Sequence, residues 1–195
     1  MYMNRNNLVI FLLIFLFCAF RIEAQVKKID TTVKMGQHGF RIVCNNKDAD
    51  KNSVTVSVIG LQTNPNKITF AAQGRLSKVL IDDFSDDGYP DLALCVYNGT
   101  DGDIGTIMGV SSENKELSPI YFPDIFLDPK LREGYKGHDE FSTVTGTILR
   151  TFPLYLPSDV PDQPTGGKRN VQYKAMKDEG RLTFKVLRTF DTKNK

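Results

Sequence analysis

The chain has 195 residues, of which 41% are apolar, 25% charged and 10% aromatic, a composition typical of folded proteins and not of disordered ones. Lysine and arginine number 25 against 23 aspartates and glutamates, and the formal charge of +2 argues against nucleic acid or an anionic membrane surface as partner. Two histidines and three cysteines without closely spaced pairs argue against a zinc site. We therefore expect a single domain with no nucleic-acid or membrane partner.

The first 24 residues have the layout of a secretion signal. Arg5 precedes an apolar run over residues 8–20, and Ile-Glu-Ala at residues 22–24 offers a small residue at a cleavage point before Gln25. A retained membrane anchor is the alternative, but 13 apolar residues are fewer than the roughly 20 that span a bilayer. We predict a signal peptide over residues 1–24 and a periplasmic or secreted domain over residues 25–195.

Cys44 and Cys95 are the two cysteines that remain once the signal is removed. An oxidising compartment favours a disulfide between them if their Cα atoms lie within about 7 Å. Two separate buried thiols are the alternative, and the sequence leaves both interpretations open.

The rest of the chain has the periodicity of β-strands. Apolar and polar residues alternate over residues 53–58, 171–175 and 182–186, and Asp178-Glu179-Gly180 predicts a hairpin turn between the last two runs. Further strands are predicted over residues 28–35, 38–44, 66–73, 75–82, 91–98, 104–111 and 141–151. Because no window of 12 residues keeps a helical period, we predict an all-β fold: an antiparallel β-sandwich or flattened barrel of about eight or more strands.

Two proline-containing stretches interrupt the strand pattern. Residues 117–140 contain three prolines and residues 153–167 contain four. Neither stretch is expected to form a central strand, because proline lacks the N–H donor that a β-ladder requires. Long irregular loops on a β-scaffold are common places for binding residues.

An acidic segment over residues 83–91 is the strongest local motif. It reads Asp-Phe-Ser-Asp-Asp-Gly-Tyr-Pro-Asp, with oxygen-bearing residues at positions 1, 3, 5 and 9 around a glycine at position 6, like the first part of a calcium-binding loop. The candidate calcium ligands are Asp83, Ser85, Asp87, the Tyr89 carbonyl and Asp91. Leu94 replaces the position-12 glutamate of an EF-hand, so we expect a loop between strands. The alternative is an acidic turn that needs no ion.

Catalytic patterns are scarce in this chain. His138 precedes Asp139, a pair that can orient an imidazole as a base, but there is no Gly-x-Ser-x-Gly motif and no cysteine with a basic neighbour. We therefore expect His138 to be structural and the protein not to be an enzyme.

Four segments occur together in one order: residues 79–91, then Gly-Tyr-Lys-Gly-His-Asp-Glu-Phe at 134–141, Arg-Thr-Phe-Pro-Leu-Tyr at 150–155, and Pro-Thr-Gly-Gly-Lys-Arg at 164–169 leading into Val-Gln-Tyr-Lys at 171–174. In content and order they resemble the PliI family of periplasmic inhibitors of invertebrate-type lysozymes, over roughly residues 75–190. The resemblance implies an antiparallel β-sandwich that binds a lysozyme or a related glycoside hydrolase and performs no catalysis.

In that family a loop with a Ser-Gly-x-Tyr arrangement enters the lysozyme cleft and hydrogen-bonds its acidic catalytic residues. The matching segment here, residues 98–106, is called the finger loop, and its four matching positions read Asp101-Gly102-Asp103-Ile104. A carboxylate placed against the enzyme's acids is desolvated beside like charge, which is unfavourable unless a proton or cation intervenes. Thr100 and Tyr97 offer a displaced hydroxyl and aromatic ring, so the resemblance implies a target-binding set of Tyr97, Thr100, Asp101, Gly102, Asp103 and Ile104.

Two functions follow from these observations. The first is an exported lysozyme-inhibitor-like protein that blocks a glycosidase cleft with the finger loop. The second is a calcium-binding interaction domain that has lost inhibitory activity, which Asp101 and Asp103 favour.

Overall fold

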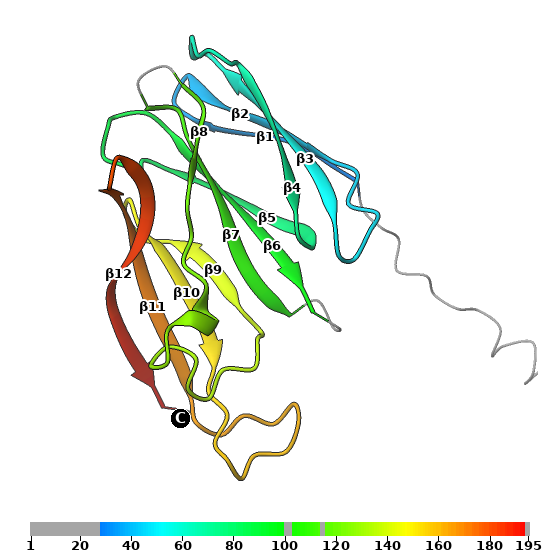
Figure 1. Ribbon diagram of the computed structural model, residues 1–195, viewed down its shortest axis with the longest axis vertical. Helices are drawn as coiled ribbons and strands as arrows, with labels where there is room; N and C mark the ends of the chain where they lie inside the picture. The colour runs from blue at the N-terminus through cyan, green and yellow to red at the C-terminus, as the bar shows by residue number, and fades with distance from the viewer. Residues whose placement is uncertain (1–27, 100–102, 114–115, 194–195) are drawn as a thin grey trace, which may run out of the picture.

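The computed structural model describes residues 28–99, 103–113 and 116–193, which form three antiparallel four-stranded sheets (Figure 1). The first sheet has the order β1-β2-β3-β4 and consists of β1 (Ile29–Met35), β2 (His38–Cys44), β3 (Asn52–Ile59) and β4 (Lys67–Ala72). The middle sheet has the order β5-β6-β7-β8 and consists of β5 (Arg75–Asp82), β6 (Asp91–Asn98), β7 (Ile104–Ser111) and β8 (Ser118–Ile120). The third sheet has the order β12-β11-β10-β9 and consists of β9 (Glu140–Thr143), β10 (Ile148–Pro153), β11 (Lys168–Asp178) and β12 (Arg181–Thr192).

The middle sheet is buried on both faces because the other two sheets cover it. One apolar cluster joins it to the first sheet and includes Phe40, Val56, Leu92, Leu94 and Val96. A second cluster joins it to the third sheet and includes Ala93, Cys95, Ile107, Phe152 and Tyr173. Successive residues of β6 therefore enter opposite cores, which explains why this strand is a continuous apolar run and does not alternate.

The antiparallel all-β prediction is confirmed, and the main differences lie in strand boundaries. Residues 141–151, predicted as one strand, divide into β9 and β10 at a turn that Val144 N–H closes on the Thr147 carbonyl at 3.0 Å. The β11–β12 hairpin turns at Glu179 and Gly180, whose φ values of 46° and 79° fit a type I′ turn.

The stretch over residues 117–140 contains one strand that the sequence did not predict. This strand, β8, contains Pro119 and lies at the edge of the middle sheet, where a missing N–H donor is tolerated. Just beyond it, Tyr121 forms a parallel bridge with Thr183 of β12 and so joins the middle sheet to the third. A short 3-10 helix, η2 (Ile125–Leu127), follows.

Cys44 and Cys95 are both free and buried, so the disulfide that an oxidising compartment would favour is not formed. Cys44 belongs to the cluster between the first and middle sheets, whereas Cys95 belongs to the cluster between the middle and third sheets. Burial raises the pKa of both thiols, that of Cys95 to about 12. The alternative of two separate buried thiols is therefore correct.

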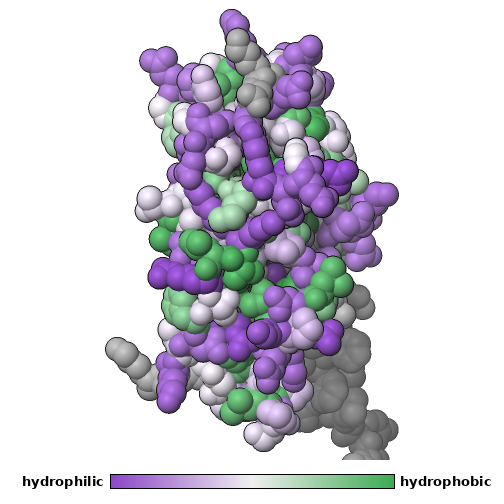
Figure 2. All heavy atoms as spheres, turned by 60° about the vertical axis from the view of Figure 1, so that its left-hand side comes forward, coloured by the Kyte–Doolittle hydropathy of each residue, from purple (hydrophilic) through white to green (hydrophobic). Residues whose placement is uncertain are grey.

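The surface carries small apolar patches separated by hydrophilic side chains, as Figure 2 shows for the side of the molecule on which β12 lies. The exposed large apolar residues include Leu127 of η2 and Val186, Leu187 and Phe190 of β12. No helix within the described ranges is long and apolar enough to cross a membrane. The predicted signal over residues 1–24 lies outside the described residues.

Candidate functional site

Strand β6 joins the two segments that the sequence singled out. The acidic segment, residues 83–91, leads into β6, and the finger loop, residues 98–106, begins where β6 ends. Because β6 is buried on both faces, both loops start from a rigid part of the fold.

The acidic loop folds around its own carboxylates. Asp83 accepts hydrogen bonds from the N–H groups of Asp87 at 3.1 Å and Gly88 at 2.9 Å, one on each carboxylate oxygen. Asp91 accepts the Ser85 N–H at 2.7 Å through Oδ2. The backbone reverses at Gly88, whose φ of 84° favours glycine. The loop is therefore shaped by carboxylate-to-backbone bonds of the kind expected for an ion-binding turn.

Three oxygens of this loop are buried without a hydrogen-bond partner: Ser85 Oγ, Asp87 Oδ2 and Asp91 Oδ1. They come from positions 3, 5 and 9 of the predicted calcium motif. Asp91 is 0% exposed, and this burial raises the pKa of its carboxyl to about 6. A buried polar atom without a partner is unfavourable, so a ligand that satisfies any of these oxygens would stabilise the loop.

The side chains of the loop alone do not form a complete metal site. Within the described ranges, no three His, Cys, Asp or Glu side chains are grouped so that they could hold a metal ion. A bound calcium would therefore depend on the Ser85 hydroxyl, the Tyr89 carbonyl and water in addition to carboxylates, a mixture that calcium accepts.

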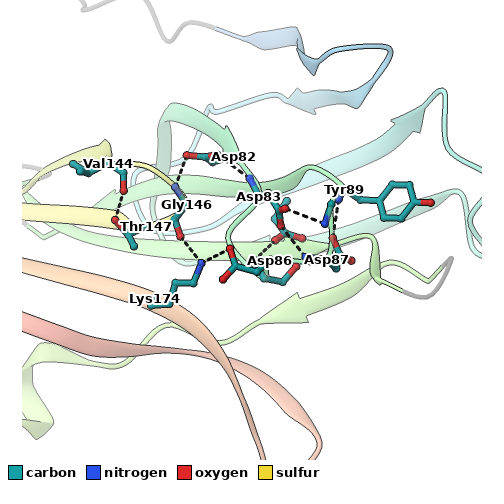
Figure 3. A network of polar contacts seen from close by, with 12 residues as sticks. Asp82, Asp83, Asp86, Asp87, Tyr89, Val144, Gly146, Thr147 and Lys174 are labelled. Carbon is teal, nitrogen blue, oxygen red and sulfur yellow. Dashed lines mark hydrogen bonds and ion pairs between the residues drawn. The ribbon is translucent and has the colours of Figure 1, made fainter.

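Polar contacts fasten the acidic loop to the third sheet (Figure 3). Lys174 Nζ on β11 lies 2.8 Å from Asp86 Oδ1 and donates to the Gly146 carbonyl at 3.1 Å. The Gly146 N–H in turn donates to Asp82 Oδ2 at 2.9 Å. Asp86 is therefore paired with Lys174, unlike Ser85, Asp87 and Asp91, each of which keeps an oxygen without a partner.

A buried ion pair clamps the base of the finger loop. Arg150 on β10 binds Asp139 through both carboxylate oxygens, at 2.6 and 3.0 Å, and the two side chains are 2% and 0% exposed. The same pair fixes Gly105: Asp139 accepts its N–H at 2.7 Å and Arg150 donates to its carbonyl at 3.1 Å. Tyr135 adds a hydrogen bond to Asp139 at 2.5 Å. We call these three side chains the clamp.

Asp103 lies on the described side of the finger loop and is turned toward its own chain. Its carbonyl accepts the N–H groups of His138 and Asp139, and its carboxylate Oδ2 lies 3.6 Å from His138 Nε2. Gly137, next to this contact, has a φ of +91°, a backbone conformation that favours glycine. His138 thus contacts the base of the finger loop, in keeping with the structural role expected for it.

The other five predicted target-binding residues fall into three groups. Thr100, Asp101 and Gly102 lie outside the described residues. Ile104 is the first residue of β7 and is partly buried. Tyr97 is half-buried, its hydroxyl donates to the Asp139 carbonyl at 2.9 Å, and its ring packs edge-on against Phe141. Tyr97 therefore supports the base of the finger loop and does not project as a free aromatic ring.

The contacts among the three clamp residues were not predicted from the sequence. Tyr135, Asp139 and Arg150 occur within the segments that resemble the lysozyme inhibitors, but no role was given to them there. The available signal was Arg150 itself, a charged residue at an inward position of an alternating strand, where burial requires a partner.

Comparisons of this chain with protein-family models, curated proteins and solved structures find no match. Any inference about function therefore rests on the residues and contacts described above.

Proposed function

We propose that the protein is an exported, non-catalytic binding protein of the lysozyme-inhibitor type, which inserts the finger loop into the cleft of a lysozyme or related glycoside hydrolase. The clamp is the observation that carries this proposal. It fixes both backbone polar groups of Gly105, directly after the finger loop's tip. A loop held in place before docking loses less conformational entropy when it binds.

A groove beside the base of the finger loop supports the same proposal. The groove has a volume of about 330 Å³ and is lined by Asn98, Ile104 and Thr106 on one side and by residues 122–126 on the other. Phe126 and its neighbour Leu127 are 46% and 81% exposed. Exposed apolar side chains beside a groove are typical of protein contact surfaces.

The position of Asp103 reduces the electrostatic conflict with an acidic cleft. Its carboxylate faces His138 at 3.6 Å and is 21% exposed. A carboxylate directed at a neighbour of its own chain is kept away from the partner's acidic residues, so like-charge repulsion at the interface is weaker.

An inhibition panel tests this proposal directly. The purified protein is added at micromolar concentration to invertebrate-type, chicken-type and goose-type lysozymes, and lysis of bacterial cell walls is followed. We expect at least one class to be inhibited, and full activity of all three contradicts the proposal. The double variant Asp101→Ser/Ile104→Tyr should inhibit more strongly, whereas Asp50→Ser in an unrelated exposed loop is the matched control.

The unpartnered oxygens favour a second candidate function, calcium binding by the acidic loop. Ser85, Asp87 and Asp91 would supply side-chain oxygens and Tyr89 its carbonyl, with water completing the six to eight ligands that calcium takes. Asp83 would hold the backbone in the binding conformation. On this alternative the protein is a calcium-stabilised interaction domain without inhibitory activity.

Thermal unfolding with calcium or with a chelator tests the second function. Calcium at 100 times its Kd should add about 2.7 kcal/mol to the free energy of unfolding. Asp91→Asn should abolish this gain. Asp86→Asn is the matched control, because it removes one charge from the same loop at a residue that pairs with Lys174. An unchanged melting temperature in the chelator contradicts calcium binding.

A further inference from the structure

A cleft lies between the first sheet and the acidic loop, apart from the finger loop. Its volume is about 440 Å³. The described residues that line it come from the start of β2, the segment after β3, the acidic loop and the end of β7: His38, Gly60, Leu61, Gln62, Thr63, Asp87, Tyr89, Ser112 and Glu113. The cleft therefore depends on contact between two sheets and does not belong to a single loop.

One wall of the cleft is aromatic. The rings of His38 and Tyr89 lie 5.8 Å apart between centroids, and Tyr89 is 46% exposed. Gly60 stands next to this wall with a φ of +72°, and a Cβ there would lie 2.4 Å from the Gln37 carbonyl oxygen. Glycine is thus required for the chain to turn so close to the aromatic pair.

Two hydrogen-bond acceptors in the lining have no partner. Thr63 Oγ1 and Asp87 Oδ2 are both buried and unbonded, while the other Asp87 oxygen accepts the Tyr89 N–H at 2.8 Å. The lining also contains Glu113, whose carboxylate pairs with Lys177, and among the described residues it contains no lysine or arginine. The charge and the open acceptors therefore favour a cationic donor and disfavour an anion.

We infer that this cleft binds a primary ammonium group, carried either by a small amine or by a lysine side chain of a partner protein. An ammonium group has three N–H donors and is attracted to the face of an aromatic ring. Asp87 is its charge partner, Thr63 accepts one hydrogen bond, and the exposed ring of Tyr89 offers the cation–π contact. Because Asp87 is also a candidate calcium ligand, calcium and the ammonium group compete for the same oxygen.

An NMR titration of the ¹⁵N-labelled protein in chelator tests this inference. The probes are Nα-acetyl-lysine methylamide, cadaverine and the uncharged analogue Nα-acetyl-norleucine methylamide. We expect both amines, or the lysine compound alone, to shift the amide signals of Gly60, Thr63 and Tyr89. Binding of the lysine compound alone identifies a protein side chain as the source, whereas binding of both identifies the free ammonium group. Equal shifts with the norleucine compound, or none with either amine, overturn the inference.

Substitutions and added calcium test which residues bind the ammonium group. Asp87→Asn should weaken amine binding about tenfold and Thr63→Val about threefold, whereas Asp86→Asn in the same loop should leave it within about twofold. If Asp87→Asn does not fold, Tyr89→Leu replaces it, with an expected loss of about threefold. Saturating calcium should weaken binding of the lysine compound. Unchanged affinity in all of these variants overturns the assignment of the cleft.

Discussion

The acidic loop and the finger loop flank the same strand, yet their backbones are held in opposite ways. In the acidic loop, carboxylates of the loop itself bind its N–H groups and leave three buried oxygens without partners. At the base of the finger loop, side chains from distant segments bind Gly105 from outside. The backbone of the acidic loop is thus ordered mainly by carboxylates of the loop itself, whereas Gly105 is ordered by side chains from residues 139 and 150.

Breaking the clamp should cause the largest loss in the free energy of unfolding. Arg150→Met leaves the Asp139 carboxylate buried without its charge partner, which should lower the free energy of unfolding by about 3–5 kcal/mol. Urea unfolding monitored by circular dichroism measures the loss. The control is Arg41→Met, which removes an exposed ion pair with Asp30 and should change the free energy of unfolding far less. Similar losses for the two variants would contradict the clamp.

The buried carboxyl of Asp91 should contribute a pH dependence of stability that the variant Asp91→Asn isolates. Folding raises the pKa of Asp91 from 3.8 to about 6, so the folded, metal-free protein binds this proton more tightly than the unfolded chain does. Its free energy of unfolding should therefore fall as the pH rises from about 4 to about 6, by on the order of 3 kcal/mol, and then level off. Urea titrations in chelator measure this decrease. Asp91→Asn is expected to remove it, and parallel curves for the two proteins would refute the assignment.

A single methyl group should disturb the finger loop without affecting the acidic loop. In Gly105→Ala the new Cβ would lie 2.7 Å from Phe141 Cε2 and 2.8 Å from Asp139 Cβ. We expect a loss of about 1–3 kcal/mol in the free energy of unfolding and weaker lysozyme inhibition. The stabilisation by calcium should stay unchanged, and its loss would show that the two loops are not independent.

The smallest change in the free energy of unfolding is expected from a substitution at the contact between the acidic loop and the third sheet. Lys174→Met removes a partly exposed ion pair with Asp86 and should cost less than about 1 kcal/mol. Calcium affinity should rise about twofold, because a positive charge near the loop is removed. Lys185→Met, which breaks an exposed pair with Asp178 on the β11–β12 hairpin, is the control. A fall in calcium affinity would contradict the role of Lys174 as a competing cation.

The local part of the fold could be predicted from the sequence, and the long-range part could not. Alternation over residues 53–58 and the turn at Glu179 and Gly180 depend on neighbouring residues, and both were found. The division into three sheets depends on contacts such as that of Tyr121 with Thr183, which no local period encodes. Residues 91–98 were predicted as a strand, but their burial between two other sheets was not predicted.

The same distinction applies to the two loops. The candidate calcium ligands lie within nine successive residues, so the sequence alone places them in one loop. The clamp joins Arg150 to Gly105, 45 residues earlier in the chain, and only the folded structure shows that these residues meet. The hydrogen bond of the Tyr97 hydroxyl to the Asp139 carbonyl, 42 residues later in the chain, is another contact that the sequence did not predict.

The placement of the two cysteines gives this protein a pair of built-in chemical reporters. Cys44 sits between the first and middle sheets and Cys95 between the middle and third, each as an unreactive thiol shielded from solvent. Pulsed alkylation with iodoacetamide, measured by mass spectrometry, would therefore detect the opening of the two interfaces separately. Modification of Cys44 would report separation of the first and middle sheets, and modification of Cys95 separation of the middle and third sheets. The order in which the two adducts accumulate would show which of the two interfaces opens first.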